Sequence, residues 1–307
     1  MIPRYSFILP AYKAQYLGEA ISSILSQSYA DFELVVVDDC SPENLKDIVD
    51  GFDDERLSYQ RNDHNLGRMD LVASWNHALQ FARGEYVILA SDDDVYAPEF
   101  LEEVDRLFSL YPDIDEVRAR VQRIDEEGRV VDVDQLYKEC MSQEEFMFWM
   151  GKGLIDCMAN HAFRTSALRE AGWCVNLPCA WFSDDATALL LAKNGIAHTQ
   201  KPLFSFRRSN ISMSYTVNPA TLKQKIIACR QYFDWAHTVL PHGDSEQVRF
   251  FQFKVKERCV TDLRRSLFQM PYSDVLYVLR LLKNIKWLYN KERIMLFVAY
   301  LIRYHKD

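Results

Sequence analysis

The hydrophobic pattern of the first third of the chain switches repeatedly between two periods. Three short stretches are almost continuously apolar, which is typical of strands buried on both faces, and a fourth, over 57–62, is a weaker strand signal. Between them, apolar residues recur every three or four positions, as on the buried side of an amphipathic helix. The strands are expected at residues 5–12, 32–39, 57–62 and 85–90, and the helices at residues 17–28, 41–52, 69–82 and 97–112. This alternation predicts an α/β fold with a mostly parallel sheet and helices on both faces.

Local signals mark the start of one helix and exclude one kind of site. Ser41 is a good N-cap for the helix over 41–52, and Pro42 suits its first turn. The turn after the first strand, "LPAYKAQY" (9–16), contains no GxGxxG. A glycine cradle for a pyrophosphate is therefore not supported there.

The remaining two thirds of the chain are less regular and then helical. Residues 115–131 predict a strand pair, and helices are expected over 166–173 and 184–195. From about residue 216 the pattern is helical throughout. We therefore expect an α/β domain over 1–215, followed by a helical C-terminal region over 216–307.

Three consecutive carboxylates follow the fourth predicted strand. Asp92, Asp93 and Asp94 come directly after the apolar run 84–90 and before the helix over 97–112. Such a triplet is commonly a solvated surface turn. Here it lies at the carboxyl end of a core strand, which is where ligands bind in open α/β sheets. Hard oxygen ligands in that place suit Mg²⁺ or Mn²⁺ held together with substrate phosphates, so the triplet is a candidate metal site.

Composition narrows the class of protein. Hydrophobic residues make up 49% and charged residues 26% of the 307 residues, as in an ordinary globular protein. We find no secretory signal pattern and no apolar stretch of the roughly 20 residues needed to span a bilayer. The seven cysteines include no CxxC pair, so we expect reduced thiols in a cytoplasmic protein. We expect no nucleic-acid partner, and the sequence leaves the oligomeric state open.

Charge is distributed unevenly along the chain. Residues 249–307 carry thirteen Lys and Arg against five Asp and Glu, although the whole chain has a net charge of −8. The tail over 272–307 mixes basic and apolar residues, and its longest apolar run, 294–302, is too short to span a membrane. Two interpretations stay open for it. The tail packs on the preceding domain, or it makes peripheral contact with an anionic membrane on the cytoplasmic face.

Four segments of the chain match one known family in order and spacing. They are "ILPAYKAQYLGEAISSILSQSYADFELVVVDDCSPE", "NLG…WNHAL…GEYVILASDDD", "FSDDATALLLAKNG" and "FRRSNISMS". Over roughly residues 3–215 the chain resembles the family 2 glycosyltransferases of bacterial polysaccharide and glycan assembly. The resemblance implies the GT-A fold and an inverting sugar transfer. Each motif alone is weak evidence for the family, whereas all four in the family's order are specific evidence for it.

The resemblance assigns candidate residues to the nucleotide. Pro10, Ala11 and Tyr12 match the turn that packs on the nucleobase in the family. Asp39 matches the acid that reads the uracil ring, and a carboxylate there would accept from the imide N–H. Arg68 is a candidate for the diphosphate.

The acid triplet looks like the family's DXD region, with one departure. Counted back from the following proline, the family's first acid falls on Ser91. The resemblance implies a Mn²⁺ or Mg²⁺ site at Asp93 and Asp94, with Asp93 the favoured direct ligand. Asp92 is then expected at the ribose or at a metal-bound water. Which two of the three acids form the metal site stays open.

The last two motifs supply the remaining candidates. Asp185 matches the family's base, and Asp184 is expected to orient the acceptor. Arg207 and Arg208 match the position of an Arg that approaches the diphosphate. Two further residues are assigned to the sugar and the acceptor, namely Asn76 and Trp181.

The expected function is metal-assisted transfer of a hexosyl or N-acetylhexosaminyl group. The donor would be a UDP-sugar, and the acceptor a hydroxyl of a glycan or a lipid-linked glycan. Two alternatives remain. One is a nucleotidyltransferase, which lacks support because no glycine-rich phosphate loop is present. The other is a nucleotide-sugar-binding module that has lost the chemistry, and the intact acids argue against it.

Overall fold

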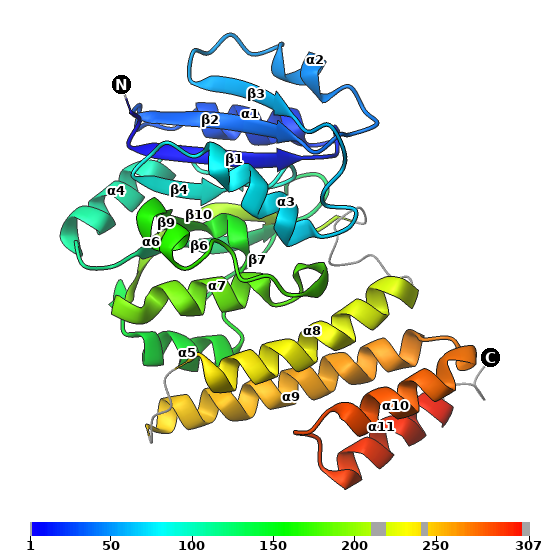
Figure 1. The fold of residues 1–307 in the computed structure, drawn as a ribbon. Helices are drawn as coiled ribbons and strands as arrows, with labels where there is room; N and C mark the ends of the chain where they lie inside the picture. Colours follow the sequence, from blue (N-terminus) through cyan, green and yellow to red (C-terminus); the bar gives the residue numbers. More distant parts are fainter. Residues whose placement is uncertain (1, 210–218, 241–244, 303–307) are drawn as a thin grey trace. The chain divides into compact units, whose positions relative to one another are not determined.

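The computed structural model describes residues 2–209, 219–240 and 245–302, and the chain divides into two compact units (Figure 1). Within the described residues, the first unit comprises 2–176 and 183–209. The second unit comprises 177–182 together with the helices that follow residue 218. Residues 177–182, which we expected in the catalytic domain, thus belong to the helical unit.

A ten-stranded sheet forms the centre of the first unit, in the order β3-β2-β1-β4-β9-β6-β10-β5. β7 pairs with β6, and β8 pairs with β10. The strands are β1 (Tyr5–Ala11), β2 (Phe32–Asp38), β3 (Leu57–Arg61), β4 (Tyr86–Leu89), β5 (Val95–Tyr96), β6 (Glu116–Ile124), β7 (Val130–Val133), β8 (Cys140–Met141), β9 (His161–Arg164) and β10 (Ile196–Arg207). From β3 to β4 all neighbours are parallel, as the alternating pattern predicted.

The other half of the sheet contains four strands that the pattern did not predict, namely the two-residue strands β5 and β8 and the longer β9 and β10. β9 inserts antiparallel between β4 and β6, although it has only four residues and includes His161 and Arg164. β10 is long but carries Pro202, and its register with β6 shifts there. Proline cannot donate to the ladder, so a sequence that contains it is a poor strand signal.

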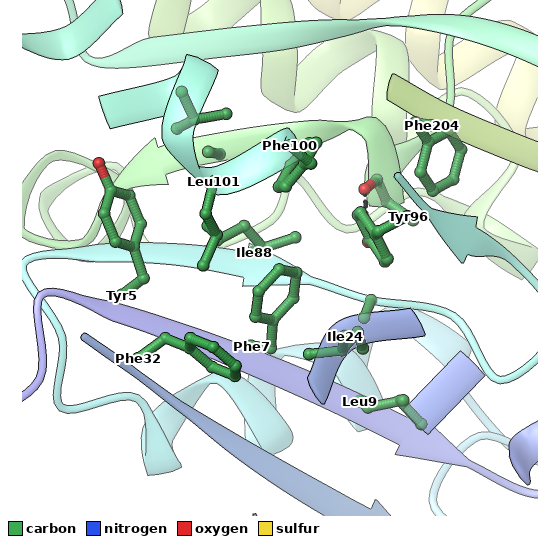
Figure 2. Close-up of a cluster of buried hydrophobic side chains, with 14 of the residues drawn as sticks. Tyr5, Phe7, Leu9, Ile24, Phe32, Ile88, Tyr96, Phe100, Leu101 and Phe204 are labelled. Carbon is green, nitrogen blue, oxygen red and sulfur yellow. Dashed lines mark hydrogen bonds between the residues drawn. The ribbon is translucent and has the colours of Figure 1, made fainter. Parts of the chain in front are cut away.

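Seven helices accompany the sheet within the described part of this unit. They are α1 (Leu17–Leu25), α2 (Leu45–Val49), α3 (Leu71–Ala78), α4 (Phe100–Leu110), α5 (Gln143–Lys152), α6 (Thr165–Glu170) and α7 (Ser183–Leu191). In Figure 1, α1 lies behind the sheet and α3 in front of it. Figure 2 shows Ile24 of α1 and Phe100 of α4 packed with Phe7 of β1 and Ile88 of β4 in the main core.

One helix begins later than expected. α2 starts at Leu45, so Ser41 and Pro42 precede it. The Ser41 hydroxyl instead donates to the Tyr12 carbonyl at 2.6 Å, and its backbone N–H donates to Asp38 at 2.7 Å. Ser41 therefore joins the ends of β1 and β2 rather than capping the helix.

The second unit is helical, as predicted for the residues that the structure describes there. It contains α8 (Pro219–Thr238), α9 (Glu246–Gln269), α10 (Val275–Asn284) and α11 (Asn290–Ile302). Among the described helices of the chain, none has the length and apolar character needed to cross a membrane.

Candidate functional site

The candidate residues gather where β1, β2 and β4 end. β1 runs parallel to both β2 and β4, so the carboxyl ends of the three strands share one edge of the sheet. Tyr12, Asp39 and Asp92 follow these ends. The sequence prediction of a shared edge is therefore realised in the fold.

Asp92 ties the acid triplet to the end of β1. Its Oδ2 accepts the backbone N–H groups of Tyr12 at 2.9 Å and Lys13 at 3.0 Å. Ala11 is buried, Pro10 is partly exposed, and the Tyr12 side chain is 42% exposed. The turn is thus held by its backbone, and the aromatic ring of Tyr12 is left at the surface beside the triplet.

Asp39 holds the loop that follows β3. Its Oδ1 accepts from Asn62 Nδ2 at 2.8 Å and from the Leu66 N–H at 2.9 Å, and its Oδ2 accepts from the Gly67 N–H at 2.7 Å. A Cβ at position 67 would lie 3.0 Å from Oδ2, so glycine allows this close approach. The exposed Arg68 follows directly. Asp39 was expected to read uracil, but its described contacts organise the loop that carries Arg68.

The backbone contacts also set the charge state of Asp39. Burial alone would raise the pKa of this carboxyl group. The N–H groups of Gly67 and Leu66 outweigh burial and lower the pKa below its usual value. Asp39 is therefore firmly ionised at neutral pH.

Arg207 contacts two members of the triplet, Asp93 and Asp94. Its backbone N–H donates to Asp94 Oδ1 at 2.9 Å, and its Nε donates to the Asp93 carbonyl at 2.9 Å. Nη2 forms an ion pair with Glu19 at 2.6 Å, and the guanidinium lies 4.3 Å from the Tyr16 ring centroid. Arg207 is only 2% exposed.

The expectation that Arg207 and Arg208 approach the diphosphate stays a prediction, but the two side chains have different surroundings. The planar guanidinium of Arg207 is already committed to protein acceptors inside the unit. Arg208, the next residue, is exposed. The alternation of side chains along a strand separates two neighbours that look equivalent in the sequence.

The triplet concentrates negative charge in a largely buried place. Burial raises the pKa of Asp92, and the charge of Asp93 raises it further. The pKa of Asp94 is raised well above its usual value by burial and then by Asp93. Asp93 accepts from the Ser91 hydroxyl at 2.5 Å. A bound cation would relieve this repulsion, so the donor set fits a hard divalent metal ion.

The protein alone does not complete such a site. Within the described ranges, no group of three or more His, Cys, Asp or Glu side chains is arranged to hold a metal ion. Asp92 and Asp94 are partly engaged by backbone N–H groups. One or two carboxylates would therefore share the ion with substrate phosphates, which is the usual situation for Mg²⁺.

The second acid pair lies at the start of α7. Asp184 Oδ1 accepts the Asp185 N–H at 2.9 Å, and Asp185 is only 3% exposed whereas Asp184 is half-buried. Burial raises the pKa of the Cys157 thiol, and the charges of Asp94 and Asp184 are among those that raise it further. Because both charges act on one thiol, the triplet and Asp184 border the same region of the unit.

Asn76 and Trp181, which the resemblance assigned to the sugar and the acceptor, both contact other parts of the protein. The Asn76 amide donates to the Cys174 carbonyl at 3.2 Å and accepts the Cys174 N–H at 3.0 Å, so it fixes a loop. Trp181 belongs to the helical unit, where its Nε1 donates to Asp262 at 3.4 Å and Lys225 lies 4.2 Å from its ring centroid. Both side chains have structural contacts that the sequence did not reveal.

A strained segment precedes the second acid pair, and no sequence signal pointed to it. Cys179, Ala180 and Phe182 all have positive φ (51°, 56° and 71°), which non-glycine residues rarely adopt. Phe182 is buried, its ring stacks on Tyr232 of α8 at 4.5 Å, and the Arg258 guanidinium lies 4.6 Å from it. The helical unit thus imposes a strained backbone directly before α7 begins.

A buried charge network, also missed from the sequence, fixes the segment that contains Cys157. Arg118 of β6 contacts Asp134 at 2.6 Å and Asp156 at 3.0 Å. His161 contacts Asp156 at 2.7 Å and Glu116 at 2.5 Å. Burial would lower the pKa of His161, but these two carboxylates raise it to about 9. The only signal available was the set of charged residues within β6, which includes Glu116, Arg118, Arg120 and Arg123.

Comparison with known proteins identifies the family. Residues 6–172 match the model of "Glycosyl transferase family 2", more than half of the chain. The putative colanic acid biosynthesis glycosyl transferase WcaA of Escherichia coli K12 is 38% identical over 102 residues, which cover 32% of this chain and 36% of that relative. An Escherichia coli β-1,3-glucosyltransferase, WfgD, is 35% identical over 98 residues, covering 32% and 38%. The matched segments thus span about a third of these relatives.

Solved structures share the fold. S. aureus TarS in complex with UDP-GlcNAc aligns over 98% of this chain and 90% of its own, with a TM-score of 0.66 at 17% identity. The mannosyltransferase PcManGT of Pyrobaculum calidifontis, in complex with GDP-Man and Mn²⁺, aligns over 99% and 87%, with a TM-score of 0.56 at 16% identity. The likeness supports the expected GT-A fold. Together with the matching family model, it shows that the chain belongs to glycosyl transferase family 2.

Proposed function

We propose that this protein transfers a sugar from a UDP-sugar to a hydroxyl group of a glycan or lipid-linked glycan. The observation that carries the proposal is the crowded acid triplet at the edge shared by β1, β2 and β4. The raised pKa values of Asp92 and Asp94 call for a cation, and phosphate oxygens would complete the coordination of that cation. A nucleoside diphosphate supplies them.

The nucleotide would lie against the ends of β1 and β2. The exposed Tyr12 ring is free to stack on the base, with Pro10 and Ala11 shaping the turn beneath it. Asp39 acts through the loop it holds and so positions Arg68. Arg208, exposed after β10, is the remaining candidate for the diphosphate.

Asp93 would hold Mn²⁺ or Mg²⁺ with one of its neighbours. The ion supplies charge stabilisation to the departing diphosphate. Asp92 and Asp94 keep the triplet in place through the N–H groups of Tyr12 and Arg207. The Arg207 ion pair with Glu19 supports the same arrangement.

Asp184 is the better candidate for the base, in place of the expected Asp185. Asp184 is half-buried, whereas Asp185 is almost fully buried and lies one position further into α7. In the proposed step the Asp184 carboxylate takes the proton of the acceptor hydroxyl. The acceptor oxygen then bonds to the anomeric carbon as the bond from that carbon to UDP breaks, with inversion.

The relatives support the chemical class of both substrates. WfgD is named as a UDP-Glc:α-D-GlcNAc-diphosphoundecaprenol β-1,3-glucosyltransferase, and WcaA as a colanic acid biosynthesis enzyme. TarS binds UDP-GlcNAc, and PcManGT was solved with Mn²⁺. A UDP-sugar donor and a polysaccharide or lipid-linked acceptor are therefore the first compounds to test.

Calorimetry and turnover test the proposal. We expect UDP to bind in the presence of Mn²⁺ and to lose most of its affinity in EDTA. Undiminished binding in EDTA would contradict the metal assignment. UDP binding without turnover of any UDP-sugar would favour a non-enzymatic binding module.

The matched pair Asp184→Asn and Asp185→Asn tests the base. Asp184→Asn should retain UDP affinity and lower kcat by a hundredfold or more, the usual contribution of a general base. Asp185→Asn should lower it less. The reverse order, with UDP still bound, would return the role to Asp185.

A further inference from the structure

The helical unit exposes an apolar face that a stable helix normally buries. On α11, four large apolar side chains recur at helical spacing and are 42–64% exposed, namely Ile294, Met295, Val298 and Ile302. The other side of α11 is also apolar, with Leu296 and Tyr300 buried. A helix that is hydrophobic all round is usually buried all round, so the exposed side calls for an apolar partner.

The preceding segment also exposes apolar side chains. Leu276 is 67% exposed and Leu279 is 44% exposed on α10, one turn apart. Tyr272 and Tyr289, at 46% and 64%, flank that helix. We call these eight apolar residues, together with the exposed basic residues Arg280, Lys283, Lys286 and Lys291, the α10–α11 surface.

Charge on the α10–α11 surface has one sign only. Every exposed charged residue between 272 and 302 is Lys or Arg. The two acids of that range are half-buried. Asp274 forms an ion pair with Lys223 at 3.0 Å, and Glu292 forms one with Lys256 at 3.2 Å. Each acid thus neutralises a lysine of α8 or α9, and the exposed charges between residues 272 and 302 are all positive.

We propose that the α10–α11 surface lies in the interface of an anionic lipid bilayer. Apolar side chains would enter the boundary between head groups and acyl chains, and the basic residues would contact anionic head groups. Tyrosine suits such an interface because one end of its side chain is apolar and the other is polar.

A second copy of the chain is a poorer occupant of this surface. In a two-fold symmetric dimer the same surface faces itself. The four exposed basic residues would then meet four more of the same sign, which is unfavourable at an interface. Charge complementarity thus favours an anionic partner, and the apolar content favours lipid.

Vesicle co-sedimentation of the full chain tests the proposal and needs no catalytic activity, so it is independent of the proposed function. Wild-type protein should pellet with phosphatidylglycerol-containing vesicles and far less with pure phosphatidylcholine vesicles. A basic residue near an anionic surface strengthens binding about fivefold. Binding to these vesicles should therefore be at least roughly 25-fold weaker for the double variant Lys283→Glu/Lys286→Glu. It should be more than tenfold weaker for the triple variant Leu276→Gln/Met295→Gln/Val298→Gln.

Two control variants change exposed residues of the first unit in the same way. Leu136→Gln and Lys201→Glu should bind vesicles like the wild type. Wild-type protein that stays in the supernatant at low salt would overturn the proposal, as would equal pelleting of all variants. It would also be overturned if sedimentation velocity showed a dimer that only the α10–α11 variants dissociate, without vesicle binding.

Discussion

The substitution Asp39→Asn tests how the nucleotide edge of the sheet is built. In the wild type the described contacts of Asp39 all come from donors, namely Asn62 Nδ2, the N–H groups of Leu66 and Gly67, and the Ser74 hydroxyl. An amide replaces one acceptor oxygen by an NH₂ group. Whichever oxygen is lost, at least one donor then faces another donor.

The expected cost follows from the charged acceptor. A hydrogen bond to a charged group contributes about 1.5–3 kcal/mol, so losing one should lower the free energy of unfolding of the first unit by that amount. For a unit of this size the melting temperature should fall by roughly 3–12 °C. The loop before Arg68 loosens, and we expect UDP affinity to fall by about tenfold.

The pH dependence of stability gives a second measurement. The pKa of Asp39 is lowered in the folded protein because the Gly67 and Leu66 N–H groups outweigh the effect of burial. The contribution of Asp39 to the free energy of unfolding is therefore complete above the pKa of the unfolded chain. It is lost as the pH falls through the pKa of the folded protein. The difference in melting temperature between wild type and Asp39→Asn should be full at pH 7 and shrink below about pH 4.

Asp63→Asn is the matched control, because it makes the same chemical change at an exposed position of the same loop. It should melt and bind UDP like the wild type. If Asp39→Asn kept full stability and lost UDP binding, the carboxylate would read the nucleobase instead of holding the loop. If both properties were unchanged, the reasoning about this edge would be wrong.

Three further substitutions probe other parts of the structure. A lysine at position 207 has no planar guanidinium group to contact both Glu19 and the Asp93 carbonyl. We therefore expect Arg207→Lys to lower UDP affinity in Mn²⁺ at least about tenfold by calorimetry, and an unchanged affinity would contradict this. Because the pKa of His161 is raised to about 9, protonated His161 stabilises the folded protein. This stabilisation is complete below about pH 6.5 and is lost as the pH rises through 9. Thermal melting of His161→Gln should therefore lack the loss of roughly 3–4 kcal/mol in that window, and a matching loss in the variant would exclude His161 as its source. Tyr232→Leu removes the ring stacked on Phe182 and should lower kcat about tenfold with the KM for donor unchanged; an unchanged kcat would show that the stack does not position α7.

The sequence alone was sufficient for the parallel half of the sheet and for the position of the acid triplet. The first four strands and the helices between them follow from apolar periodicity, which reflects contacts of each element with the core. The triplet could be placed at a ligand-binding edge because β4 was recognised as a buried strand with acids directly behind it. The four ordered motifs identified the family before any contact was known.

The tertiary structure decided which of several neighbouring residues face solvent. Arg207 is buried and Arg208 exposed, and Asp185 is buried whereas Asp184 is half-buried. A motif names such neighbours together, but exposure depends on what packs against each side chain from far along the sequence. Phe182 shows the same dependence, because its strained backbone is held by Tyr232 and Arg258 of α8 and α9.

Long-range pairing explains the rest of what the sequence left open. β9 joins the sheet only because β4 and β6 offer it two free edges, although its four residues have no strand pattern of their own. The apolar residues of α11 looked equivalent in the sequence, and packing buried Leu296 and Tyr300 while leaving the opposite side exposed. Periodicity is a local property that predicts elements, whereas burial is a property of the whole fold and determines which residues of an element can meet a ligand or a membrane.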